Sequence, residues 1–149
     1  MKEMFINSQF NSDIGEWNTL RVENMSSMFT ASQFNRSINQ WCVARVTDMA
    51  EMFAASQFDK DISGWDVSNV ERMSYMFCDS QFKGDISEWN IVSLMYINDI
   101  FLFCKAPVPY WAKIDNMQER QNAMQTYNCK KALDISLSTN NKTSKVLKI

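Results

Sequence analysis

Acidic side chains recur at one position of this sequence and are the first candidates for chemistry. Asp13, Asp61 and Asp85 are separated by multiples of 24 residues, and Ser37 stands at the missing step. If neighbouring copies lie on adjacent extended segments, Asp61 and Asp85 are about 5 Å apart, which suits the two carboxylates of a retaining glycosidase. A calcium site is the second chemistry that such oxygen ligands allow. The structural alternative is that each carboxylate bonds the backbone at a corner of the chain.

Nucleophiles and soft metal ligands are scarce. The four cysteines contain no CxxC pair, and the sequence has no histidine. A tetrahedral zinc site would need all four sulfur atoms, and none has the spacing of clustered ligands. We therefore expect no catalytic residue, no metal site, no cofactor and no enzymatic activity. We also expect free cysteines, with disulfides as the alternative in an exported chain; the cysteines are Cys42, Cys78, Cys104 and Cys129.

The acidic position is one column of a repeat. The tripeptide Ser-Gln-Phe begins at Ser8, Ser32, Ser56 and Ser80, always 24 residues apart. Apolar side chains recur in register around it, and a fixed period of this size indicates stacked units that cannot bury their apolar faces alone. We assign these columns to the core rather than to an adaptable methionine groove or an aromatic binding row. They include Phe10, Phe34, Phe58 and Phe82; Trp17, Trp41, Trp65 and Trp89; Met1, Met25, Met49, Met73 and Ile97; Met4, Met28, Met52, Met76 and Ile100; and Phe5, Phe29, Phe53, Phe77 and Phe101.

The third unit shows how one coil is expected to fold. Four apolar residues follow the i, i+3, i+6, i+7 spacing of a helix face, and Ser68 and Glu71 have the spacing of a capping box. Residues 58–65 read as a short extended segment, which stacking would place about 4.8 Å from its neighbours in a parallel sheet. The sequence thus predicts an α/β solenoid: a leucine-rich-repeat-like, right-handed stack of about four 24-residue coils, each a short strand plus a short helix, with a C-terminal capping helix. The helix-face residues are Val70, Met73, Met76 and Phe77.

The pattern divides the chain into three predicted parts. Residues 1–103 form the repeat solenoid. Residues 104–135 form a C-terminal cap with a helix, because the open end of a solenoid needs a cover. Residues 136–149 are rich in Ser, Thr, Asn and Lys and are predicted to be a disordered basic tail.

Local signals support the start of the cap. Pro107 and Pro109 interrupt the repeat, because proline cannot donate to a hydrogen-bonded ladder. Asp115 is a suitable cap for a helix, and we expect that helix to end near Leu133.

Charge is divided unevenly along the chain. Residues 1–103 hold seven Lys/Arg against 14 Asp/Glu, a net charge of −7, whereas residues 104–149 hold eight against three, a net charge of +5. Binding of nucleic acid needs a basic stripe, so the acidic repeat argues against nucleic acid as the partner. No apolar run approaches the length of a membrane span, and no signal peptide opens the chain.

The first coil begins without its full pattern. Met1 and Met4 occupy columns that follow a Val elsewhere, and that Val is missing here. We therefore expect either a fragment of a longer protein or a gene that is truncated upstream. A first coil without a cap would present unpaired backbone groups, so the sequence also predicts self-association through this uncapped coil.

The third repeat carries the motif of a known family. Residues 58–70 read Phe-Asp-Lys-Asp-Ile-Ser-Gly-Trp-Asp-Val-Ser-Asn-Val, followed by Met73 and by Met76-Phe77. This segment resembles F-N-x-D-I-S-x-W-D-V-S-x-V-x-x-M-x-x-M-F, the repeat of the BspA-like leucine-rich-repeat surface proteins, which include the mycoplasma-type lipoprotein repeats. The other coils depart from the motif after the Trp, and the resemblance covers residues 1–103.

The resemblance implies an exported bacterial or protist surface protein with a role in adhesion and host contact. It therefore implies a cell-surface or secreted location for the full-length protein, and it supplies no catalytic residue. We expect a non-enzymatic protein-interaction module whose partner is another protein, of the host or of a surface. The alternative is a structural spacer or a targeting domain of a larger protein such as an effector.

Positions that differ between coils are the candidates for the partner surface, because stacking does not fix them. A solubilising surface is the alternative for each single residue. Among the variable positions, the ring of Tyr75 is the first candidate for an interface anchor. The candidate protein-binding residues are Arg36, Lys60, Glu51, Tyr75 and Glu88.

Overall fold

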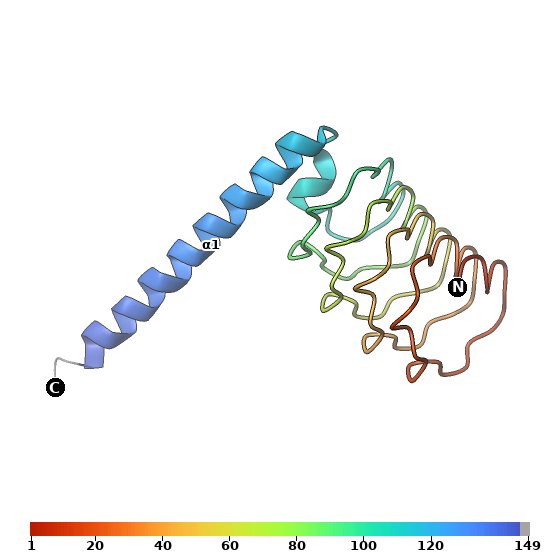
Figure 1. The fold of residues 1–149 in the computed structure, drawn as a ribbon. Coiled ribbons are helices and arrows are strands. Elements are labelled where there is room, and N and C mark those ends of the chain that lie inside the picture. The colour runs from red at the N-terminus through yellow and green to blue at the C-terminus, as the bar shows by residue number, and fades with distance from the viewer. Residues whose placement is uncertain (147–149) are drawn as a thin grey trace. The chain divides into compact units, whose positions relative to one another are not determined.

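The computed structural model describes the backbone of residues 1–146 and the side chains of residues 1–137. The chain separates into two compact units, Met1–Asp115 and Asn116–Ile149. In the first unit the backbone winds through similar loops that lie one on another, coloured red to green in Figure 1. We call residues 1–103 the coil stack. Each unit is described by itself.

Backbone hydrogen bonds between coils hold the coil stack together. Each coil contains a turn segment, which is residues 27–31 in the second coil. In this segment the backbone N–H groups of alternate residues donate to carbonyl groups of the next coil. Ser27 donates to the carbonyl of Ala50 at 2.8 Å, and Phe29 donates to that of Met52 at 2.9 Å. These hydrogen bonds fix the register between coils. If one coil shifted by a residue relative to the next, the whole row of bonds would be broken. The equivalent bonds are Glu3–Ser26, Phe5–Met28, Asn7–Thr30, Ala31–Ala54, Glu51–Ser74, Phe53–Met76, Ala55–Cys78, Tyr75–Asn98, Phe77–Ile100 and Asp79–Leu102.

Each turn segment places two residues in the left-handed region of backbone space. Ser27 and Ala31 have φ of 52° and 54°. Each is the third residue of a four-residue turn, as in the turn that the N–H of Ser32 closes on the carbonyl of Phe29 at 3.1 Å. A left-handed third residue marks a type II turn, where glycine or asparagine is usual, yet glycine stands at none of these positions. They are Glu3, Asn7, Ser27, Ala31, Glu51, Ala55, Tyr75, Asp79, Asp99 and Phe103.

Stacked side chains fill the inside of the coils. The rings of Phe29 and Phe53 lie 5.7 Å apart and nearly parallel. A second phenylalanine row lies beside the first, with the rings of Phe29 and Phe34 at 4.4 Å. Such aromatic pairs contribute about 0.5–1.5 kcal/mol each beyond their burial. From the second coil on, the methionines of the repeat are fully buried next to these rows; they are Met25, Met28, Met49, Met52, Met73 and Met76.

Polar side chains complete the corner that follows each turn segment. The hydroxyl of Ser32 accepts the N–H of Phe34 at 3.3 Å. Further along, the side-chain oxygen of Asn35 accepts the N–H of Asp59 at 3.0 Å, and the carboxylate of Asp59 accepts the N–H of Lys83 at 2.9 Å. Side-chain oxygens therefore take the part that backbone carbonyls play in a β-ladder.

The predicted α/β solenoid of strand–helix coils is wrong. Within residues 1–146, extended pairing is limited to isolated parallel bridges, and no sheet forms. The coils contain no helix in this range either, since the described helices are η1 and α1, which both follow the coil stack. The bridges join Asn24 to Asp48, Asp48 to Arg72 and Arg72 to Tyr96.

The spacing of the apolar residues misled the helix prediction. Two consecutive turns of four residues also bury positions three and four residues apart, so the same spacing fits both structures. In a helix the N–H of Phe77 would bond within its own coil, but it donates to Ile100 at 2.9 Å. The predicted capping box fails for the same reason: Ser68 closes a local turn on Asp66, and the N–H of Glu71 donates to Thr47.

A short 3-10 turn and one long helix follow the coil stack. The turn η1 is Tyr110–Lys113, and the helix α1 is Met117–Val146. The side chain of Asn116 caps α1, because its oxygen accepts the N–H of Glu119 at 3.0 Å. The observed cap thus lies one residue beyond the predicted cap, Asp115, and the helix continues past the predicted end. The boundaries after residues 103 and 135 and the disorder of residues 136–149 stay predictions, and residues 147–149 lie outside the described residues.

Replacing Ala55 by glycine tests the left-handed positions. Glycine adopts φ of this sign without steric cost, so Ala55→Gly should raise the free energy of unfolding by about 0.5–1 kcal/mol after the entropy of the unfolded chain is subtracted. Ala54→Gly is the matched control, because Ala54 is not left-handed, and it should lower stability. Urea unfolding measures both, and a destabilising Ala55→Gly would contradict the turn assignment.

Candidate functional site

The recurring aspartates serve the backbone. The carboxylates of Asp61 and Asp85 accept the N–H groups of Ser63 and Ser87, each at 2.9 Å, and Asp13 does the same with Gly15. The bonds from the backbone N–H of Ser63 and of Ser87, followed by those from their hydroxyls, lower the pKa of Asp61 and Asp85. A glycosidase acid needs a raised pKa instead, so these carboxylates are turn formers.

The cysteines are not paired with one another. All four are free in the structure. Burial raises the pKa of the thiols of Cys78 and Cys104, which disfavours the nucleophilic thiolate. Among the residues that the structure describes, no three His, Cys, Asp or Glu side chains come together to hold a metal ion. Over the same residues, neither helix has the length and apolar character to cross a bilayer.

The tryptophan column is structural. The indole N–H of Trp41 donates to the carbonyl of Ile14 in the preceding coil at 3.0 Å, and Trp65 and Trp89 repeat this bond at 3.2 Å. These three indoles are buried, which removes them as a stacking surface for a ligand. From the second coil on, the methionine and tryptophan columns therefore belong to the core, as predicted, whereas Met4 and Trp17 of the first coil are 49% and 40% exposed.

The five predicted surface residues fall on separate parts of a coil. All are exposed. Glu51 and Tyr75 are equivalent left-handed residues of neighbouring turn segments. Arg36 and Lys60 share a different column, after the Ser-Gln-Phe corner, where the guanidinium of Arg36 donates to the carbonyl of Asn11 at 2.9 Å. Glu88 stands in a third column. The fold thus makes two pairs and one single residue from the predicted set.

Sequence reasoning missed the most exposed aromatic residue of the coil stack. The side chain of Phe103 is 79% exposed, and its φ of 58° is a rare conformation for so bulky a residue. Its column otherwise holds small or polar residues, namely Asn7, Ala31, Ala55 and Asp79. The available signal was a phenylalanine in a column whose other members are small or polar residues.

Phe103 belongs to a patch on the last two turn segments. The backbone bond from Asp79 to Leu102 is 2.7 Å long and that from Tyr75 to Asn98 is 2.8 Å, so these segments run side by side. Tyr75 is 39% exposed and Leu102 is 38% exposed. We define the turn-row patch by its apolar members Tyr75, Leu102 and Phe103 and its acidic members Asp79 and Asp99, together with Glu51 of the preceding turn segment.

The acidic members lie near the thiol of Cys78. Burial raises the pKa of the Cys78 thiol first, and the carboxylates of Asp79, Asp99 and Glu51 raise it further. No Lys or Arg side chain of residues 1–137 forms an ion pair with these three carboxylates. The turn-row patch therefore combines exposed aromatic surface with negative charge.

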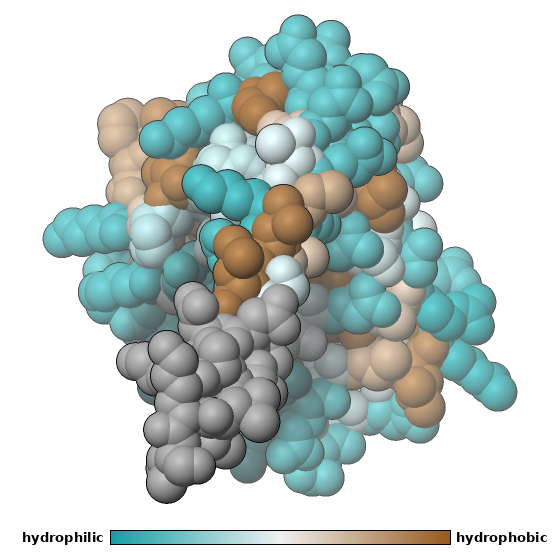
Figure 2. Space-filling view, turned by 90° about the vertical axis from the view of Figure 1, so that its left-hand side faces the viewer, coloured by the Kyte–Doolittle hydropathy of each residue, from teal (hydrophilic) through white to brown (hydrophobic). Residues whose placement is uncertain are grey.

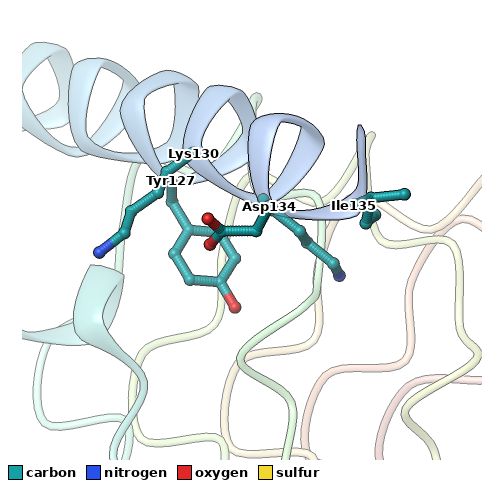
Figure 3. A pocket seen from close by; sticks show the side chains of 5 residues that line it. Tyr127, Lys130, Asp134 and Ile135 are labelled. Atoms are coloured by element: carbon teal, nitrogen blue, oxygen red, sulfur yellow. The ribbon is translucent and has the colours of Figure 1, made fainter. Parts of the chain in front are cut away.

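Elsewhere the surface offers little enclosure. In the view of Figure 2, apolar residues form small separate groups within a mainly hydrophilic surface. A hollow along α1 is lined by Tyr127, Lys130, Lys131, Asp134 and Ile135, and Figure 3 shows Tyr127 and Asp134 pointing to the same side of the helix. Side chains of one helix cannot surround a small molecule, so we do not assign a ligand site there.

The repeat identifies the family of this chain. The family model DUF285, described as a Mycoplasma protein of unknown function, matches residues 1–111. The chain belongs to this family. The match includes the whole coil stack and fits the mycoplasma-type repeat suggested by the motif. Comparisons with curated proteins and with solved structures give no match.

The pH dependence of stability tests the role of Asp61. Its pKa is lowered from 3.8 in the folded protein, so the charged carboxylate stabilises the fold above that value and loses this effect as the pH falls further. The stability difference between the wild type and Asp61→Ala should therefore shrink from about pH 6 to about pH 2.5 in urea unfolding. A difference that stays constant over this range would contradict the turn role.

Proposed function

We propose that this DUF285 chain is a non-enzymatic protein-interaction module of a bacterial surface or secreted repeat protein, with a role in adhesion or host contact. The observation that carries the proposal is the turn-row patch. The repeated side chains are buried between coils, whereas Tyr75 and Phe103 stand on exposed left-handed residues where the stacking has no use for a ring.

The chemistry of the patch favours a protein partner. Aromatic residues are enriched among the few side chains that dominate the energy of protein interfaces. The acidic coil stack would repel phosphates, which disfavours nucleic acid. Exposed rings beside carboxylates suit a partner that offers both apolar and basic side chains.

The setting of the proposal comes from the family and from the resemblance. A Mycoplasma family fits a bacterial source, and the BspA-like motif supports an exported protein that contacts a host. A cell-surface or secreted location of the full-length protein is part of the same proposal. The spacer or targeting alternative differs in one respect, since it requires no binding by the turn-row patch.

Binding to cells tests the proposed function. The variant Tyr75→Ser, Phe103→Asn takes its new residues from the equivalent positions Ser27 and Asn7 of the same chain, so the fold should tolerate it. Loss of two interface anchors should weaken binding of the labelled chain to cultured animal epithelial cells by about 10- to 100-fold.

The control for this experiment removes apolar surface elsewhere. Val108 is 44% exposed and lies outside the coil stack, so Val108→Ser should bind as the wild type does. Circular dichroism of all three chains checks that their folds match. No cell binding by the wild type, or equal binding by the double variant, would favour the spacer alternative.

A further inference from the structure

The last turn segment of the coil stack has open backbone donors. In the four earlier segments, the N–H groups of alternate residues donate to the next coil, as Phe77 does to Ile100 at 2.9 Å. The fifth segment is residues 97–103, which we call the donor end. Its corresponding N–H groups form no hydrogen bond with any residue that the structure describes; they belong to Asp99, Phe101 and Phe103.

The first turn segment has open backbone acceptors. In later coils the carbonyl groups of equivalent residues accept the bonds from the coil before, as Met28 accepts the N–H of Phe5 at 2.9 Å. We call residues 1–7 the acceptor end. Within the described chain its corresponding carbonyl groups accept no hydrogen bond; they belong to Lys2, Met4 and Ile6.

The two ends are complementary. The open donors and the open acceptors both occur at every second residue, which is the spacing that joins successive coils inside the stack. Their side chains are complementary as well, since Ile6 and Leu102 stand at opposite ends of one column and are each 38% exposed. Met4 at the acceptor end is 49% exposed, whereas its counterpart Met28 is fully buried by the preceding coil. Each end therefore offers what the other lacks.

One chain cannot join its own two ends. Four coil steps of about 4.8 Å separate the acceptor end from the donor end, a distance of about 19 Å. The helix α1 cannot replace the missing coil either, because the carbonyl groups inside a helix accept bonds from their own helix. The acceptor end of another copy is the described surface that provides open carbonyl groups at the required spacing.

We propose that the donor end of one copy of this chain stacks on the acceptor end of a second copy. The contact repeats the step between successive coils, and the ring of Phe5 continues the column that ends at Phe101. The inference does not rest on the proposed function, and it gives the self-association predicted for the first coil its second surface. The pairs of N–H and carbonyl groups are Asp99 with Lys2, Phe101 with Met4, and Phe103 with Ile6.

The contact joins two different surfaces, which decides the form of the assembly. A heterologous contact leaves a free acceptor end on one side and a free donor end on the other. The copies therefore add head to tail, and the assembly grows with protein concentration instead of stopping at a closed dimer. At each junction the rings of Phe101 and Phe5 should stack as those of Phe77 and Phe101 do at 5.5 Å.

Complementary variants of the full chain test the contact by sedimentation velocity. Met4→Glu disables the acceptor end and Leu102→Glu disables the donor end, because each carboxylate is exposed in the free chain but loses water in the junction. The wild type should form growing species between about 1 µM and about 200 µM, and each variant alone should associate at least about 10-fold more weakly. An equimolar mixture should form a one-to-one dimer and nothing larger, since one intact donor end meets one intact acceptor end.

A matched control separates the junction from a general effect of added charge. Met95 is 43% exposed, and its column is exposed in every coil, at Glu23, Thr47 and Glu71, so stacking does not bury it. Met95→Glu should therefore associate as the wild type does. Reductant is kept throughout, because Cys129 is exposed and could form disulfides between copies. Each variant should keep the circular dichroism spectrum of the wild type.

Three results would overturn the inference. They are a wild type that stays monomeric, an end variant that associates as strongly as the wild type, and a mixture without a dimer. Association that is lost in Met4→Glu but unchanged in Leu102→Glu would assign the contact to the first coil alone. The proposed function is tested apart from this inference, since a monomeric chain that binds cells keeps the former and an assembling chain that does not bind them keeps the latter.

Discussion

The constraint on which the coil stack depends is the backbone pairing between successive turn segments. Alternate N–H groups leave their own coil and bond to the next at a constant offset, so every residue must lie above its counterpart. That pairing needs left-handed residues at two places in each coil, Ser27 and Ala31 in the second. It also explains the aromatic ladders, since the rings of Phe29 and Phe53 can stack only if the register holds. The 24-residue repeat in the sequence follows from this register.

The same constraint decides where the chain is free to vary. Side chains that point between coils are fixed by their neighbours above and below, whereas those on the left-handed residues meet solvent. Non-glycine residues there cost about 1–2 kcal/mol in conformational energy, and glycine would relieve that cost at every one of them. Tyr75 and Phe103 therefore occupy positions at which glycine would make the fold more stable. Strain of this kind is grounds for inferring a function.

Much of this organisation can be predicted from the sequence, but the secondary structure cannot. The 24-residue register and the buried Phe, Trp and Met columns follow from the spacing alone. A helix face and a pair of four-residue turns bury the same positions, however, and only the sign of φ separates them. No glycine marks the left-handed residues, so the usual signal is missing. The candidate site is limited in the same way. Tyr75 was predicted because its column varies between coils, whereas Phe103 was missed because the exposure of its column depends on the turns.

In a stack of equivalent coils, a separation of 24 residues in the sequence corresponds to one fixed step in space. Equivalent residues of neighbouring coils are about 5 Å apart, so the surface presents a row of exposed side chains at fixed steps. Glu51, Tyr75 and Asp99 form one such row, and Asp79 and Phe103 form the next. An aromatic ring between two carboxylates is a pattern that no single coil could present, because each coil supplies one residue to each row. The order of the coils therefore sets the pattern of exposed side chains, while the buried columns keep the spacing between them constant.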